Sequence, residues 1–143
     1  TPCGTLFPYT TLFRSVRRAV SVQTAQVLKR IMATVIEEGG TGINGAIDGY
    51  KVCGKTGTAQ KIGENGGYVS KKYVSSFVGF APLEDPKIAV LVVVDEPRRN
   101  HYGGIVAAPA FKTIGSRILQ YMNIPPDGNT ESVTASGRGR ITG

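Results

Sequence analysis

The longest unbroken apolar run in the chain, residues 88–94, is the feature that most constrains its fold. It contains only Ile, Ala, Val and Leu, and it is far shorter than the roughly 20 residues of a membrane-spanning helix. A short run rich in β-branched residues favours a buried strand. Because both of its faces are apolar, we expect the strand over residues 87–95 to lie centrally in a sheet, covered on both sides.

Two further strands are predicted before it, over residues 50–60 and 73–81. Residues 63–67 separate them with a glycine-rich turn. The five-residue connection 82–86 predicts an antiparallel hairpin between the last two strands. Gly54 and Gly57 are unusual inside a strand, and they suggest a close approach to the backbone.

A helix is predicted over residues 22–38, with Ser21 as its N-cap and the glycines at positions 39 and 40 as its stop. Its apolar residues recur at helical spacing and form one stripe, which we interpret as core packing. The stripe consists of Val27, Leu28, Ile31, Met32, Val35 and Ile36.

A second helix is predicted to begin near Pro109 and to end near Asn123, after a loop over residues 96–107. Its predicted apolar face is formed by Phe111, Ile114, Ile118 and Tyr121. The order helix, strand, strand, strand, helix predicts an α+β fold, with helices flanking an antiparallel sheet. With three strands only, the apolar third strand would keep an unpaired edge, so we expect further strands in the whole protein.

The two ends of the chain are expected to lie outside this domain. Residues 5–15 read as the translation of a DNA-sequencing adapter, so we interpret residues 1–15 as non-native; the alternative is a natural strand rich in Thr and Phe. Without residues 1–15 and their Arg14, the formal charge falls from +7 to +6, and Cys53 is the only native thiol. Residues 127–143 are rich in Gly, Ser, Thr and Arg, which predicts a disordered tail.

Charge and composition favour neither nucleic acid nor a metal as a ligand. The basic residues are scattered in pairs such as Arg17–Arg18 and Lys71–Lys72, without a sustained basic helix, so no nucleic-acid partner is predicted. Two cysteines and the single His101 do not make a metal site, and no cofactor is expected. We expect Cys53 to be a buried structural thiol and His101 to be a surface loop residue.

Lys55-Thr56-Gly57-Thr58 is the one motif that carries chemistry. A Lys-Thr-Gly triplet accompanies a Ser-x-x-Lys nucleophile and a Ser-x-Asn element in penicillin-recognising serine enzymes. Further motifs follow in order: Ser-Phe-Val-Gly-Phe-Ala-Pro at 76–82, Asp-Glu-Pro at 95–97, Tyr-Gly-Gly at 102–104 and Ala-Ala-Pro-Ala-Phe at 107–111. With these motifs, residues 16–126 resemble the C-terminal part of the transpeptidase domain of class B penicillin-binding proteins, the division-type peptidoglycan D,D-transpeptidases. The resemblance implies part of a penicillin-binding/β-lactamase-like fold.

The resemblance also implies roles for the four residues. Lys55 would be catalytic, sharing a proton with the serine of Ser-x-Asn and attracting the substrate carboxylate. Thr58 would be both catalytic and substrate-binding, through its backbone N–H in an oxyanion hole and its hydroxyl on a carboxylate. Thr56 and Gly57 would be substrate-binding as well: Gly57 would keep the groove open for an added substrate strand, and Thr56 would pack or hydrogen-bond behind the strand. Lys55 and Thr58 are three residues apart, so both reach one cleft only if the strand twists or bulges.

The nucleophile itself is missing, because the sequence contains neither Ser-x-x-Lys nor Ser-x-Asn in a fitting place. In the resembled family both elements lie upstream, so we expect this chain alone to be inactive and to complement the upstream part of the same domain. The implied ligands are the D-Ala-D-Ala stem peptide of peptidoglycan and β-lactams. The implied location is the outer face of the bacterial cytoplasmic membrane, reached through an N-terminal anchor outside this chain.

Three alternatives stay open. The chain could belong to a serine β-lactamase or a D,D-carboxypeptidase, which perform different reactions on the same scaffold. It could also be a non-enzymatic binding module with this fold. In the plainest alternative, residues 55–58 are an ordinary glycine-containing strand with a solvated lysine.

Overall fold

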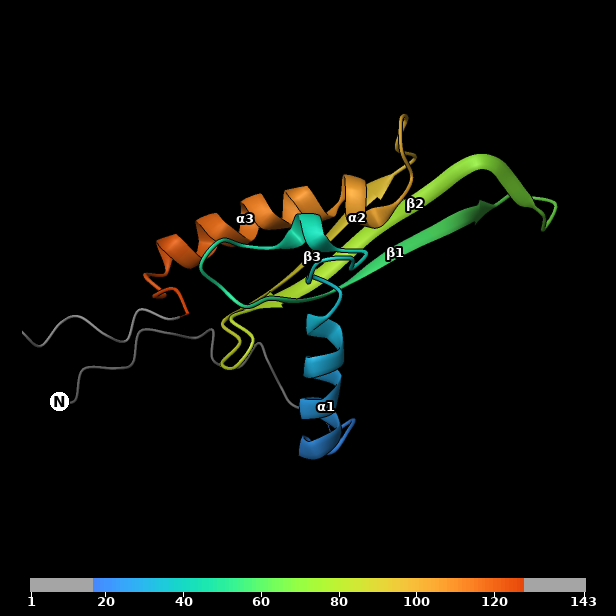
Figure 1. Ribbon diagram of the computed structural model, residues 1–143. Helices are drawn as coiled ribbons and strands as arrows, with labels where there is room; N and C mark the ends of the chain where they lie inside the picture. The colour runs from blue at the N-terminus through green and yellow to red at the C-terminus, as the bar shows by residue number, and fades with distance from the viewer. Residues whose placement is uncertain (1–16, 128–143) are drawn as a thin grey trace, which may run out of the picture.

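The computed structural model describes residues 17–127, which fold as one helix, three strands and two helices, with a short 3-10 turn before the first strand (Figure 1). This order confirms the predicted α+β class. The predicted non-native segment 1–15, and all but the first residue of the predicted tail 127–143, lie outside the described residues. The elements are α1 (Val22–Ala33), η2 (Ile43–Gly45), β1 (Cys53–Ile62), β2 (Tyr68–Ala81), β3 (Ile88–Asp95), α2 (Gly103–Val106) and α3 (Ala108–Tyr121).

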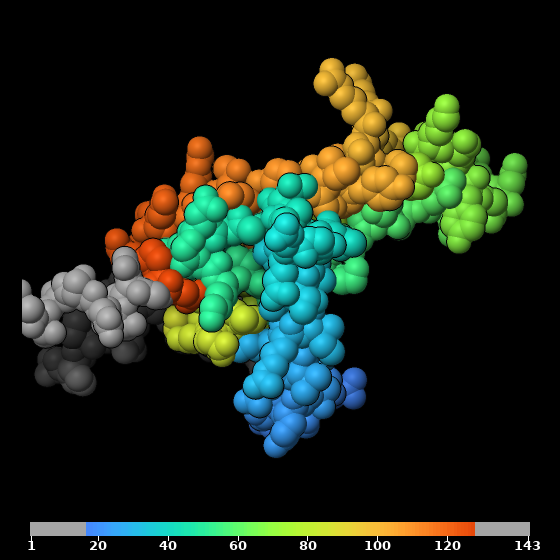
Figure 2. Space-filling model, viewed as in Figure 1, coloured from blue at the N-terminus to red at the C-terminus, as the bar shows by residue number. Residues whose placement is uncertain are grey.

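The strands form one antiparallel sheet in the order β1-β2-β3, so the predicted hairpin between the last two strands is confirmed. The predicted turn at residues 63–67 is also present, and Gly66 adopts a φ of +78° there, in the region that glycine favours. β1 begins at residue 53 rather than 50, and β2 begins at residue 68 rather than 73. The β1–β2 hairpin therefore extends as an arm beyond the rest of the sheet (Figures 1 and 2).

Among residues 17–127, β3 is an edge strand next to β2, as a sheet of three strands requires, and its central position in the whole protein stays a prediction. Its side chains alternate between two environments. Val90, Val92 and Val94 pack against the core, whereas Leu91 and Val93 are 63% and 55% exposed. An apolar run cannot distinguish a strand covered on both faces from one that α3 covers on a single face, and α3 contacts only one face here.

α3 packs its buried face on the sheet, with the ring of Phe111 centred 4.9 Å from that of Phe77. Of the predicted apolar face, Phe111 is buried and Ile118 is half-buried, whereas the prediction is wrong at the other two positions. Ile114 is exposed and Tyr121 is 88% exposed, while the helix buries Ala108, Phe111, Gly115 and Leu119. The true face contains small residues, which a search for large apolar side chains overlooks.

α1 begins as predicted, because Ser21 Oγ accepts the N–H of Thr24 at 3.0 Å. It ends at Ala33 rather than near residue 38, and tight turns follow it up to residue 42. The predicted core packing of its stripe is confirmed only at the far end, where Ile36 contacts the core. Val27 and Ile31 are 55% and 58% exposed, because α1 points away from the sheet (Figure 1).

The predicted loop 96–107 contains the short helix α2, which runs directly into α3. Pro109 lies in the first turn of α3, as predicted. Cys53 is fully buried and donates from Sγ to the Lys29 carbonyl at 2.9 Å, which confirms the structural thiol. Within residues 17–127, no helix has the length and hydropathy to cross a bilayer.

Candidate active-site strand

The motif at residues 55–58 lies in a regular part of β1, which is the other edge strand of the described sheet. Lys55 is paired with Val78 and Thr58 with Ser75. The pairing is uninterrupted from Cys53 to Gln60. One edge of β1 is thus bonded to β2, while its other edge has no strand partner within residues 17–127. Such an edge offers backbone N–H and C=O groups to an extended peptide.

Lys55 lies on the α1 side of the sheet. Cys53, two residues earlier and therefore on the same face, bonds to the α1 residue Lys29. The Lys55 side chain is exposed, and its Nζ donates to the carbonyl of Thr56 at 2.9 Å. The ammonium group is therefore held beside the backbone of its own strand.

The two threonines lie on the opposite face, toward α2. Thr56 Oγ1 is 3.2 Å from Thr41 Oγ1, in a hydrogen bond that either hydroxyl can donate. Thr58 Oγ1 accepts the N–H of Gly103, the first residue of α2, at 3.3 Å. Lys55 and Thr58 thus face opposite sides, as simple strand geometry predicts. The one irregularity of β1, between Gln60 and Ile62, comes after the motif, so no bulge reorients either side chain.

Glycines give this region its close packing. A Cβ on Gly57 would collide with Ser76 Oγ on the neighbouring strand. A Cβ on Gly103 would lie 2.6 Å from the Gly57 carbonyl oxygen, and one on Gly104 would collide with the Thr41 carbonyl. α2 therefore rests directly on the backbone of the motif, and the Tyr-Gly-Gly run at 102–104 is the sequence signal for this contact.

Polar and aromatic groups to which the sequence analysis gave no role at the site lie behind Thr58. Ser75, its cross-strand partner, donates from Oγ to the His101 carbonyl. The ring of His101 stacks on Tyr73 at a centroid distance of 4.2 Å. His101 was predicted to be a surface loop residue, and it is instead half-buried against the sheet.

Beyond the motif, an ion-pair cluster links side chains of all three strands. Lys61 Nζ lies 2.7 Å from Asp95 Oδ1 and 2.9 Å from Glu96 Oε1, and Lys72 Nζ lies 3.4 Å from the same Glu96 oxygen. The Lys61 ammonium lowers the pKa of the Glu96 carboxyl, and the two carboxylates raise the pKa of Lys61. The cluster ties β1 to the start of the segment that leads to α2.

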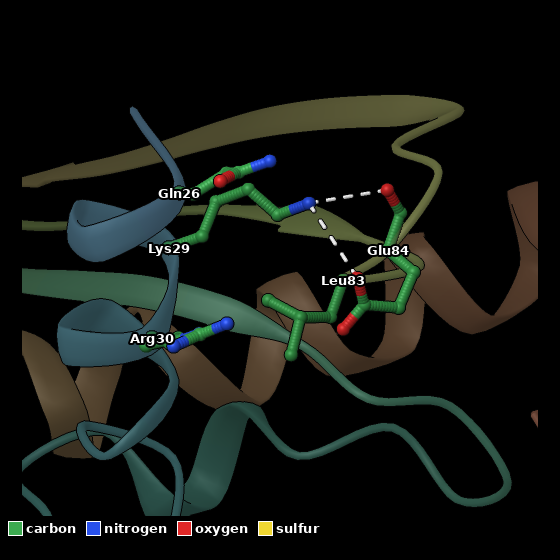
Figure 3. Close-up of a pocket in the computed structure, with 5 residues that line it drawn as sticks. All are labelled: Gln26, Lys29, Arg30, Leu83 and Glu84. Carbon is green, nitrogen blue, oxygen red and sulfur yellow. Dashed lines mark hydrogen bonds and ion pairs between the residues drawn. The ribbon is translucent and has the colours of Figure 1, made fainter. Parts of the chain in front are cut away.

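A separate cavity of about 250 Å³ lies between α1 and the β2–β3 turn (Figure 3). Lys29 spans it, donating from Nζ to the Glu84 carbonyl at 3.1 Å, with the Glu84 carboxylate 4.0 Å away. Gln26, Arg30 and Leu83 complete its lining, which includes no residue of the 55–58 motif. No group of three His, Cys, Asp or Glu side chains in residues 17–127 is arranged to hold a metal ion.

Comparisons with known proteins place this geometry in context. The family model of the penicillin binding protein transpeptidase domain matches residues 9–116. A probable peptidoglycan D,D-transpeptidase PenA of Neisseria flavescens is 46% identical over 111 residues, covering 77% of this chain and 28% of the relative. The peptidoglycan D,D-transpeptidase FtsI of Escherichia coli K12 is 43% identical over 101 residues, which cover 70% of this chain and 17% of FtsI. This chain therefore spans between a sixth and about three tenths of the length of these relatives.

Solved structures give the same match. The transpeptidase domain of Burkholderia pseudomallei penicillin-binding protein 3 is 43% identical, with a TM-score of 0.71 over 78% of this chain and 34% of that one. Penicillin-binding protein 3 of Mycobacterium tuberculosis, complexed with ampicillin, is 34% identical. The match has a TM-score of 0.68 and covers 79% of this chain and 27% of that protein. Both identities are high enough for the shared fold to reflect a shared family.

Proposed function

We propose, from the premise that this chain belongs to the penicillin-binding protein transpeptidase family, that it supplies one wall of the substrate groove of a peptidoglycan D,D-transpeptidase. The observation that carries the proposal is the place of residues 55–58, in regular register, on the edge of β1 that has no strand partner among the described residues. A stem peptide or a β-lactam would align along this edge by backbone hydrogen bonds. The ampicillin complex of the Mycobacterium tuberculosis relative supports a β-lactam as a ligand.

In this proposal, Lys55 supplies positive charge on one side of the edge. Its ammonium would share a proton with the serine of a Ser-x-Asn element. Because Lys55 and Thr58 face opposite sides of β1, the ammonium would attract the substrate carboxylate by its charge only, and Thr58 would contact that carboxylate directly. The exposure of Lys55 and its bond to the Thr56 carbonyl support this role, because the side chain lies along the strand without an acidic partner in residues 17–127.

Thr58 acts from the other side of the strand. Its hydroxyl would donate to the carboxylate of the terminal D-Ala or of a β-lactam, and its backbone N–H would form half of an oxyanion hole. Thr56 would steady the strand through its hydroxyl bond to Thr41. Gly57 would keep the groove open, and it also leaves room for the Ser76 hydroxyl.

The reaction of the whole protein would be acyl transfer. A serine outside this chain would attack the carbonyl carbon of the penultimate D-Ala, and the terminal D-Ala would leave as the amine after taking up a proton. An amine of a neighbouring stem peptide would then attack the acyl-enzyme ester, release the serine and form the cross-link. The names of the relatives favour this reaction over a β-lactamase or a carboxypeptidase.

We further propose that the whole protein acts in the cell wall, on the outer face of the cytoplasmic membrane. Peptidoglycan cross-linking requires this location. The membrane contact would come from a segment outside residues 17–127. Within residues 17–127, no helix is long and apolar enough to span a bilayer.

A chimeric enzyme tests the proposal. Residues 17–127 replace the matching segment of the Neisseria flavescens relative, and the purified chimera is incubated with a fluorescent penicillin. We expect covalent labelling, slowed by about 100-fold or more by Lys55→Ala, because a group that moves a proton is lost. Lys112→Ala is the matched control, since Lys112 is an exposed lysine on α3 paired with Asp48 at 3.1 Å.

Two outcomes would refute the proposal. In one, the chimera melts cooperatively yet stays unlabelled while the Neisseria flavescens protein is labelled. In the other, Lys55→Ala and Lys112→Ala are labelled at the same rate, which would show that the ammonium beside β1 contributes nothing specific.

A further inference from the structure

Among the polar and charged side chains of residues 17–127, Ser75 is the one that is fully buried, with 0% of its surface exposed. A buried hydroxyl is costly unless it is hydrogen-bonded, and the Ser75 Oγ donates to the His101 carbonyl. Its burial prevents it from attacking a substrate. Ser75 therefore affects the site only through the groups that it holds in place.

The groups that Ser75 holds in place are connected to Thr58 by pairing and hydrogen bonds. Ser75 is the cross-strand partner of Thr58, and His101 lies two residues before Gly103. The N–H of Gly103 in turn reaches Thr58 Oγ1 at 3.3 Å. Asn100 Oδ1 also accepts the N–H of Tyr102 at 2.9 Å, so two side chains hold this turn.

The direction of the hydrogen bond between Gly103 and Thr58 determines what the Thr58 hydroxyl can do. A threonine hydroxyl has one hydrogen to donate and lone pairs that accept. Because the Gly103 N–H donates to Thr58 Oγ1, the hydroxyl hydrogen stays free for another acceptor. At 3.3 Å the bond is already long, so a small shift of the turn would break it and free the hydroxyl to rotate.

We propose that Ser75 is a positioning residue for Thr58: by fixing the His101 carbonyl it holds the Gly103 N–H on Thr58 Oγ1, and so directs the Thr58 hydroxyl toward the carboxylate of an incoming stem peptide or β-lactam. This inference rests on the proposed function, in which Thr58 binds that carboxylate. It adds a residue behind the strand to the residues that line the groove.

The test is a double-mutant cycle in the chimera, read as the second-order rate constant of acylation by the fluorescent penicillin. We expect Ser75→Ala to lower it about tenfold, the effect of one hydrogen bond. Thr58→Val should lower it at least as much, and the double variant should be no slower than Thr58→Val alone. A purely structural role of Ser75 would instead make the two losses multiply.

Tyr50→Phe is the matched control, because the Tyr50 hydroxyl donates to the Ile124 carbonyl at 2.6 Å in a half-buried bond away from β1. We expect it to be labelled at the parent rate. Asn100→Ala loosens the same turn from its exposed side. It should lower the acylation rate constant in the parent chimera, and it should not lower it further when combined with Thr58→Val. It therefore decides the question if Ser75→Ala does not fold.

The possible failures are distinguishable. A parent chimera that melts cooperatively yet stays unlabelled, while the Neisseria flavescens protein is labelled, would refute the proposed function and this inference together. A labelled parent with an unaffected Ser75→Ala, or losses that multiply with Thr58→Val, would refute the role of Ser75 and leave the proposed function standing.

Discussion

Replacing Gly103 with alanine is expected to separate α2 from the motif strand. The new Cβ would lie 2.6 Å from the Gly57 carbonyl oxygen and closer still to that of Ser76. Ordinary contacts begin at 3.4 Å, so the deficit toward Gly57 alone is about 0.8 Å. Both oxygens belong to the backbone of the sheet and cannot rotate away. Overpacking of this kind costs about 1–3 kcal/mol.

Gly115→Ala is the matched comparison, because it adds the same methyl group to a helix that packs on the same sheet. Its Cβ would lie 2.7 Å from Ile47 Cδ1, which is the end of a flexible side chain. Alanine also gains about 1 kcal/mol over glycine in the interior of a helix. Since rotation of Ile47 can relieve the contact, we expect the free energy of unfolding to change by less than about 1 kcal/mol.

Urea unfolding of the chain, followed by far-ultraviolet circular dichroism, measures both variants. The midpoint should fall for Gly103→Ala and stay close to the parent value for Gly115→Ala. In the chimera, Gly103→Ala should also slow acylation, because the Gly103 N–H moves off Thr58 Oγ1. Equal midpoints for the two variants would contradict the steric argument, since they would show that the backbone of the sheet yields as easily as the Ile47 side chain.

Two further predictions concern titration and reactivity. The pKa of Glu96 is lowered below its ordinary 4.5 by Lys61, so its stabilising contribution is present above that value and is lost as the pH falls through the folded pKa. The difference in urea midpoint between the parent and Glu96→Gln should therefore be larger at about pH 6 than at about pH 3, and a constant difference would contradict the ion pair. Burial raises the pKa of the Cys53 thiol, so in a Cys3→Ser background the native chain should react with a disulfide reagent at least about tenfold more slowly than the urea-unfolded chain. Equal rates would show that Cys53 is accessible.

The sequence predicted the elements of this fold better than their surroundings. The three strands, the β2–β3 hairpin, the Ser21 cap and the start of α3 follow from local patterns and are present. Coverage of a strand is a tertiary property, so the apolar run at 88–94 did not reveal that Leu91 and Val93 are exposed. α1 ends early for a related reason: the chain turns at residue 34 to bring Ile36 onto the core, although the apolar pattern continues.

At the candidate site, the motif was visible in the sequence and its supports were not. Lys55, Gly57 and Thr58 stand out as a known combination of residues. The contacts that fix Thr58 come from a backbone N–H and from the Ser75 hydroxyl, which carry no pattern of their own. Glycines are the sequence signal for such contacts, because a backbone can approach another backbone closely only where no Cβ intervenes. Gly103 therefore marks where α2 meets the carbonyls of Gly57 and Ser76, and Gly104 marks where it meets the carbonyl of Thr41, so a glycine pair after a loop predicts a backbone contact that hydrophobic periodicity cannot detect.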